Sequence, residues 1–76
     1  MRVVQEIDDL VTRWDYASAT IRYQGHASPG TATSAPQWRI KRFTFDAQAR
    51  VIAVEFAGGS GERNQIWDNR ASLGYS

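Results

Sequence analysis

Hydrophobic and polar residues alternate with a period of two through the second half of the chain, which predicts a β-hairpin over residues 37–57. In its first strand, residues 37–45, the pair Trp38 and Ile40 faces one way, and the pair Phe43 and Phe45 faces the other. Its second strand, residues 50–57, places two sets of side chains on opposite faces: Ile52, Val54 and Phe56, and Val51, Ala53 and Glu55. The turn 46–49 lacks glycine, which favours a four-residue connection built on a type I turn.

Both faces of this predicted hairpin carry large apolar side chains, which is more than one small core requires. Two explanations follow from the sequence. Either the sheet closes into a barrel, with a β-bulge that changes the facing of the side chains, or another chain covers one face. The alternation does not choose between them.

The first part of the chain predicts a second pair of strands. Residues 10–16 fit a strand, although the apolar residues from Val4 to Trp14 also fall at helical spacing. Ile21 and Tyr23 give the returning strand, residues 19–25, one apolar face, after a tight turn at Ala17-Ser18. Residues 1–9 are interpreted as an N-terminal arm that is either extended or helical.

Residues 27–36 are small, polar and rich in turn formers, which predicts a surface loop. Pro29-Gly30 fits the two central positions of a type II turn, where glycine supplies the positive φ. Pro36 cannot donate a ladder hydrogen bond and therefore marks the point where the next strand starts. Loops of this kind in small domains are often contact surfaces.

The C-terminal part predicts a short last strand over residues 63–67, after the glycine loop 58–61. Asp68 is expected to cap a single helical turn over residues 69–73, and Gly74 is expected to end it. Tyr75-Ser76 would then be free to pack or to reach a neighbour. The chain as a whole is predicted to be one all-β domain, residues 1–76, with about five strands in a small antiparallel meander or barrel or a sandwich.

The length and the cysteine content of the chain limit how this domain can be stabilised. A domain of 76 residues buries only about 60% of its unfolded surface, so its own core is marginal. Since there is no cysteine and only one histidine, disulfides, thiolate metal sites and histidine-rich metal sites are excluded. Oligomerisation or docking into a larger assembly remains, and no metal or cofactor is expected.

The charge composition points to protein contacts. Nine basic and eight acidic residues are well mixed and give a net charge of +1, which disfavours nucleic acid as a partner. Eight of the nine basic residues are arginine, a residue that is enriched at protein interfaces where lysine is depleted. No apolar run approaches a membrane span, and residues 1–9 lack the features of a signal peptide.

The side chains that could carry chemistry do not form a catalytic pattern. His26 has no evident nucleophile or orienting carboxylate beside it, and we interpret it as an exposed or hydrogen-bonded loop residue. Asp8-Asp9 fits a solvated arm better than a metal site. The loop Gly58-Gly-Ser-Gly61 matches neither phosphate-binding fingerprint, since no helix follows it. The sequence therefore predicts a protein that is not an enzyme.

Aromatic residues and arginines supply the candidate interaction residues. Trp38 and Trp67 are expected to supply most of the core, and Arg70 is expected to form an ion pair that fixes the C-terminal turn. Because these residue types also dominate interfaces, the candidates for contact with a partner are Trp14, Tyr23, Pro29, Trp38, Arg42, Trp67, Arg70 and Tyr75.

Several short motifs in a fixed order link the chain to a family. In order, they are Asp15-Tyr16, Ile21-Arg-Tyr-Gln-Gly-His-Ala27, Pro29-Gly-Thr-Ala-Thr-Ser34, Trp38-Arg-Ile-Lys-Arg42, Asp46, Glu55-Phe-Ala-Gly-Gly59, Trp67-Asp-Asn-Arg-Ala-Ser-Leu73 and Tyr75. This set, over residues 11–75, resembles a family of short bacteriophage gene products that are encoded among virion structural genes and are often associated with tails. Phe56 stands where that pattern has tryptophan, and Gly59 where it often has an acidic residue.

The resemblance implies a virion structural protein that assembles in multiple copies with other phage virion proteins. A tail, neck or fibre component is slightly favoured over a capsid decoration protein. The protein is expected in the virion, after assembly in the host cytoplasm. A homo-oligomer or a symmetric assembly is expected. The resemblance implies no enzymatic role and identifies no functional residues. The alternatives are a glycan-binding module, in which exposed tryptophans stack on sugars, and a nucleic-acid-binding module.

Overall fold

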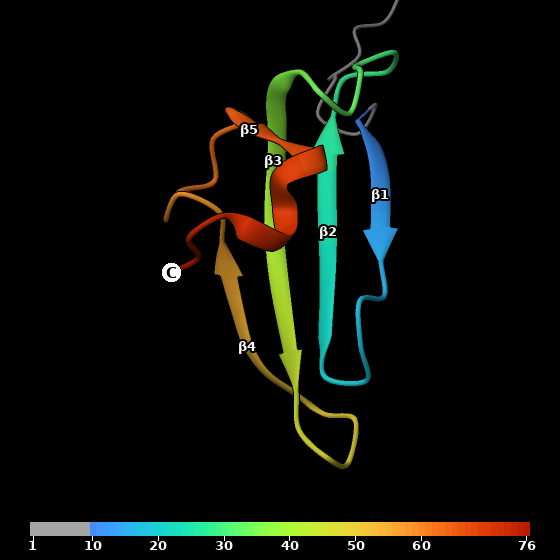
Figure 1. Ribbon diagram of the computed structural model, residues 1–76, viewed down its shortest axis with the longest axis vertical. Coiled ribbons are helices and arrows are strands. Elements are labelled where there is room, and N and C mark those ends of the chain that lie inside the picture. Colours follow the sequence, from blue (N-terminus) through green and yellow to red (C-terminus); the bar gives the residue numbers. More distant parts are fainter. Residues whose placement is uncertain (1–9) are drawn as a thin grey trace, which may run out of the picture.

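The computed structural model describes residues 10–76, which form an antiparallel sheet (Figure 1). Its strands are β1 (Val11–Asp15), β2 (Ile21–Ala27), β3 (Pro36–Phe45) and β4 (Val51–Phe56), and they pair in the order β1-β2-β3-β4. This order is that of a meander, in which β1 and β4 are the edges of an open sheet. The predicted all-β fold is therefore confirmed, in its meander form.

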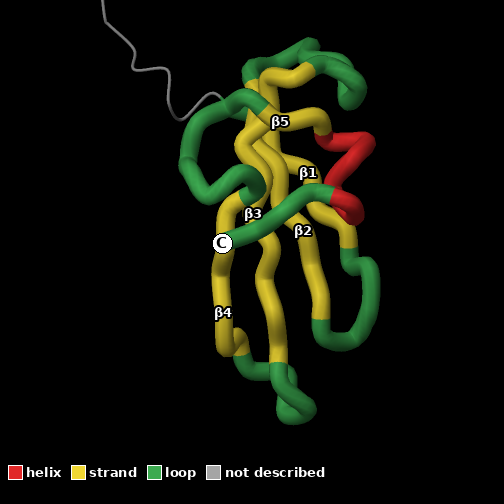
Figure 2. The backbone as a smooth tube through the Cα atoms, turned by 60° about the vertical axis from the view of Figure 1, so that its left-hand side comes forward, coloured by secondary structure: helices red, strands yellow, loops and turns green. Residues whose placement is uncertain are grey.

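The short strand β5 (Gln65–Ile66) pairs with β3 beyond the end of β4, and the 3₁₀ helix η2 (Trp67–Ser72) follows it directly. Figures 1 and 2 show that this C-terminal segment crosses one side of the sheet. The end of the chain then returns to β4, where the backbone groups of Phe56 and Ser76 exchange hydrogen bonds of 3.0 and 3.2 Å. The sheet therefore has two different faces. The C-terminal segment lies on one of them, the covered face, and leaves the opposite one, the open face, uncovered.

The strand register assigns each side chain to one of these faces, since directly paired residues point the same way. Tyr23, Gly25 and Ala27 of β2 and Trp38 and Ile40 of β3 lie on the covered face and are buried. The residues between them point to the open face. The predicted opposite facing of the pairs Trp38/Ile40 and Phe43/Phe45 is consistent with this register.

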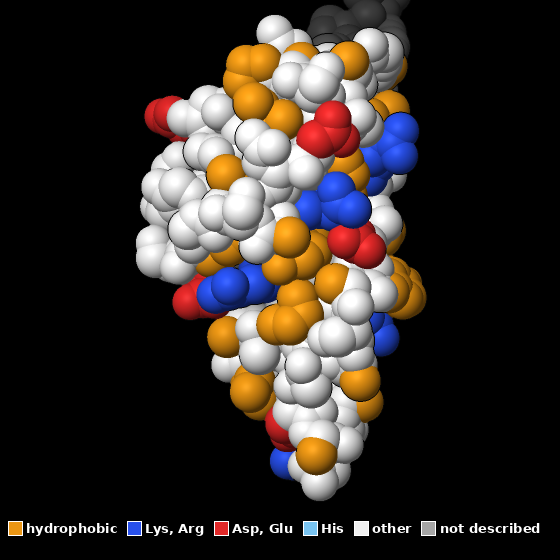
Figure 3. Space-filling view, in the orientation of Figure 1, with side chains coloured by type: hydrophobic (Ala, Val, Ile, Leu, Met, Phe, Trp, Pro, Cys, Tyr) orange, Lys and Arg blue, Asp and Glu red, His pale blue; other side chains and the backbone are white. Residues whose placement is uncertain are grey.

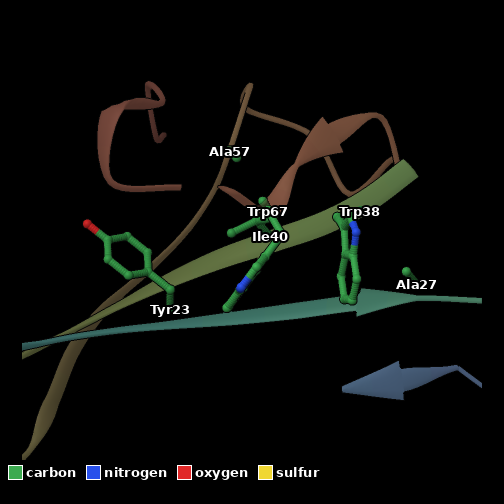
Figure 4. Close-up of a cluster of buried hydrophobic side chains, with 6 residues drawn as sticks. All are labelled: Tyr23, Ala27, Trp38, Ile40, Ala57 and Trp67. Carbon is green, nitrogen blue, oxygen red and sulfur yellow. The ribbon is translucent and has the colours of Figure 1, made fainter. Parts of the chain in front are cut away.

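The core lies between the covered face and the C-terminal segment (Figure 4). It consists of Tyr23, Ala27, Trp38, Ile40, Ala57 and Trp67, with Ile21, Leu73 and Tyr75 packed against it. The rings of Trp38 and Trp67 have centroids 5.8 Å apart. The indole N–H of Trp38 donates a 3.0 Å hydrogen bond to the carbonyl of Ala32, which ties the 28–35 loop to the core. A core this small depends on a few large rings.

Gly25 allows the Trp67 ring to lie directly on the sheet. A Cβ atom at this position would lie 2.5 and 2.7 Å from two carbons of the Trp67 ring and 3.0 Å from the Trp38 ring. Any larger residue would therefore collide with both indoles. Glycine in the interior of a strand often marks such a close approach.

The β3–β4 connection is held by an aspartate rather than by glycine. Asp46 accepts hydrogen bonds at Oδ1 from the backbone N–H groups of Gln48 and Arg50, at 2.8 and 3.0 Å. Ala49 has a φ of 63°, a left-handed conformation that residues other than glycine adopt uncommonly. The pairing register shifts between Thr44 and Phe45, so the β-bulge considered for the hairpin is present while the sheet stays open.

Three local predictions are wrong. His26 lies inside β2, which runs to Ala27, and not in a loop, because β1 and β3 pair with it on both sides. The helical turn begins at Trp67, its N-cap is Ile66, and it has no side-chain cap, so Asp68 is not a cap. Leu73 ends the helix in an extended conformation, and Gly74 has no positive φ. The N-terminal arm, residues 1–9, lies outside the described residues.

Candidate interaction face

The open face combines aromatic and basic side chains across all four strands. Trp14, Gln24, Lys41 and Phe56 form one cross-strand row, and Arg22, Phe43 and Val54 form the next. Thr12, His26 and Arg39 form a third row. In these rows there are three arginine or lysine side chains and no carboxylate.

The cations of this face rest on its aromatic rings. The guanidinium carbon of Arg22 lies 4.5 Å from the centre of the Tyr16 ring and 4.6 Å from that of Phe45. The ammonium of Lys41 lies 5.6 Å from the centre of the Phe56 ring. Such contacts are attractive, because the ring face is electronegative. These contacts hold the basic groups in place.

Trp14 is the exposed tryptophan of the sheet, with 47% of its surface accessible, whereas Trp38 and Trp67 are buried. Its ring packs against Phe43 at a centroid distance of 5.6 Å and meets Tyr16 edge-on at 6.3 Å. Val54 on the same face is 46% accessible. These groups form an apolar area beside the basic rows.

Three polar atoms of the open face are buried without a hydrogen-bond partner: Gln24 Oε1, His26 Nδ1 and Arg39 Nε. The pKa of His26 is lowered from 6.5 by burial and by the charges of Arg39 and Lys41. The imidazole is therefore neutral at neutral pH. These atoms are already buried within the chain itself, and Arg42 Nε on the covered face is a further one, so they do not distinguish the open face as a contact surface.

The covered face has a different charge pattern, because two of its basic residues, Arg42 and Arg70, are paired with carboxylates. Arg42 contacts Glu55 at 2.8 Å, and Arg70 contacts Asp15 at 2.8 Å. Figure 3 shows this face, where basic and acidic side chains lie beside one another. The guanidinium of Arg70 also covers the Trp67 ring at 4.7 Å and donates to the Trp67 carbonyl. The ion pair predicted for Arg70 is present, with Asp15 as its partner.

The structure separates the predicted interaction residues into two groups. Six of them belong to the core or to the groups that enclose it: Tyr23, Trp38, Arg42, Trp67, Arg70 and Tyr75. Trp14 lies on the open face, and Pro29 lies in the exposed loop between β2 and β3. The eight residues therefore do not form one contact surface.

The interaction candidates predicted from the sequence did not include the basic residues of the open face. Arg22, Arg39 and Lys41 alternate with the covered-face residues of β2 and β3. Their alternation with Tyr23 and Ile40 was a usable signal, since a strand with one buried face presents every second residue to the other side. The strand pairing that gathers them is not visible in the sequence.

Tyr75 gives the fold a testable dependence on alkaline pH. Burial and the nearby Tyr23 raise its pKa from 10.0 to about 12, against the opposing charges of Arg42 and Arg70, and its hydroxyl donates a 2.8 Å hydrogen bond to the Arg70 carbonyl. As the pH rises from 10 to about 12, the unfolded chain loses the phenol proton first. The free energy of unfolding should therefore fall over this interval.

Urea unfolding of the wild type and of Tyr75→Phe, at neutral pH and across that interval, checks this expectation. At neutral pH the variant should lose about 1 kcal/mol with the hydrogen bond, and its alkaline loss should be smaller than that of the wild type. An equal alkaline loss in both proteins would mean that another group is responsible.

Within residues 10–76, no group of three or more His, Cys, Asp or Glu side chains could hold a metal ion. A shallow depression is lined by Ser28, Thr31, Gln37 and Arg63, with Arg63 donating to the Ser28 hydroxyl at 3.3 Å. No helix in this part of the chain is long and apolar enough to cross a membrane.

Comparison with known proteins identifies no similar protein. No family model matches the chain, and no curated protein or solved structure does so either.

Proposed function

We propose that the chain is a bacteriophage virion structural protein that assembles in multiple copies with other virion proteins. It resides in the virion after assembly in the host cytoplasm. A tail, neck or fibre component is favoured over a capsid decoration protein. The motif resemblance of residues 11–75 supports the phage assignment, and the open face supports an assembly role.

The observation that carries the assembly role is the one-sided core. The C-terminal segment covers one face of the sheet, while the other face keeps Trp14, Val54 and neighbouring aromatic rings at its surface. Aromatic residues and arginine are the types that protein interfaces favour. A small domain with a marginal core gains stability when such a face is buried against a partner.

Mass spectrometry of purified phage particles tests this function. The chain should be present in particles that have been freed of soluble host proteins, and its ratio to the major capsid protein should be a fixed number. A low ratio to the major capsid protein, as expected for a tail component, would support the favoured location. A ratio that matches the capsid lattice would indicate a location on the head. Its absence from particles that are produced while the chain is expressed would contradict the proposal.

A further inference from the structure

The open face has a charge pattern that selects among partners. Its cross-strand rows hold Arg22, Arg39 and Lys41 and no carboxylate. The carboxylates of Asp15 and Glu55 in the strands lie on the covered face and are already paired. If two copies met through their open faces, like charges would be placed opposite one another, which is unfavourable at an interface. A second copy of this chain is therefore a poor occupant.

Single-stranded nucleic acid is also a poor fit to this face. Bases bind such surfaces by stacking on free aromatic rings beside a basic groove. Here Arg22 already lies over the Tyr16 and Phe45 rings, and Lys41 lies over Phe56. The chain as a whole carries a net charge of only +1. Because Tyr16 and Trp14 remain 66% and 47% exposed, it is the low net charge, more than coverage of the rings, that disfavours nucleic acid.

We propose that the open face binds an acidic surface of another virion protein, in which carboxylates lie beside apolar side chains. Carboxylates of the partner pair with Arg39 and Lys41, and its apolar groups cover Trp14 and Val54. This inference rests on the proposed virion function and adds the binding face and the chemistry of the partner.

Lys41 makes the proposal testable in the unmodified chain, because it is the only lysine in the sequence. A carbodiimide joins a carboxylate directly to an amine as an amide, without a spacer, so only groups in contact react. Purified particles are treated with the carbodiimide, digested and analysed by mass spectrometry. We expect a Lys41 peptide joined to an aspartate or glutamate of a different virion protein. We also expect Lys41 to lose most of its reactivity towards an amine-modifying reagent on assembly, compared with the free chain.

Four results would overturn the proposal while leaving the virion function intact. The first is an amide between Lys41 and a second copy of this chain, and the second is a link from Lys41 to DNA when particles are treated with formaldehyde instead. The third is full amine reactivity of Lys41 within the particle. The fourth is protection of Lys41 from the amine reagent without any amide to a carboxylate. Absence of the chain from particles would be a separate result, because it rejects the proposed function on which the inference rests.

Discussion

Replacing Trp67 with alanine is expected to leave the domain largely unfolded at room temperature. The Trp67 ring is 5% exposed, packs on Trp38 and is covered on its outer side by Arg70. Removing a buried tryptophan costs about 3–5 kcal/mol, whereas a domain of this size has a total stability of only a few kcal/mol. Near-ultraviolet circular dichroism and urea unfolding measure the loss.

Trp14→Ala is the matched control for this prediction, because it makes the same chemical change at a half-exposed position. Its unfolding midpoint should stay much closer to that of the wild type. Near-equal midpoints for Trp14→Ala and Trp67→Ala would show that the C-terminal segment does not hold the core together.

Gly25→Ala should destabilise the domain by about 1–3 kcal/mol, the usual cost of overpacking a core. Propensity alone predicts the opposite sign, since glycine within a strand is less favourable than alanine by about 0.5–1 kcal/mol. The collision of a Cβ atom with the Trp67 and Trp38 rings decides the sign. The midpoint and slope of a urea titration give the change in the free energy of unfolding.

Gly74→Ala provides the comparison. A Cβ atom at Gly74 would meet nothing within 4 Å, and its φ is not positive. This variant should be neutral or slightly more stable, because alanine restricts the unfolded chain. If Gly25→Ala were as stable as Gly74→Ala, the Trp67 ring would not lie on the sheet as the structure shows.

The hairpin β3–β4 could be predicted closely because its signal is local. Alternation gives the facing of Trp38 and Ile40 directly, and Pro36 marks the start of β3. The end of β2 could not be placed in the same way. By propensity Gly25 is expected to end the strand, yet the strand continues to Ala27 because β1 and β3 pair with it on both sides. Position 25 is glycine because the distant Trp67 ring occupies the space of a Cβ atom.

The candidate site was harder to predict because exposure depends on long-range packing. The prediction that Trp38 and Trp67 supply most of the core is confirmed, and Trp14 remains half-exposed. The prediction of all three as contact candidates was less accurate, because only the path of the C-terminal segment shows which face of the sheet is covered. Likewise, Arg70 is paired with Asp15, far away along the chain. The sequence predicted an ion pair for Arg70 but did not identify this partner.

The contrast between the two faces also explains how one small sheet can carry apolar groups on both sides. The covered face is completed within the chain by β5, η2 and the C-terminal residues. The open face receives no such cover from residues 10–76 and keeps its basic groups on its aromatic rings. Its composition fits the alternative in which another chain covers it, as we propose.

The most direct test of that claim is to count copies of two charge-reversal variants in purified particles. Lys41→Glu changes the open face, and Arg13→Glu makes the same change at an exposed position of β1 that pairs with Gly25 on the covered side. Urea midpoints of both variants establish that they fold. Each is supplied to a phage that lacks the gene, and mass spectrometry gives the copies per particle. We expect Arg13→Glu to reach the wild-type number and Lys41→Glu to be largely lost; equal incorporation of both would contradict the claim.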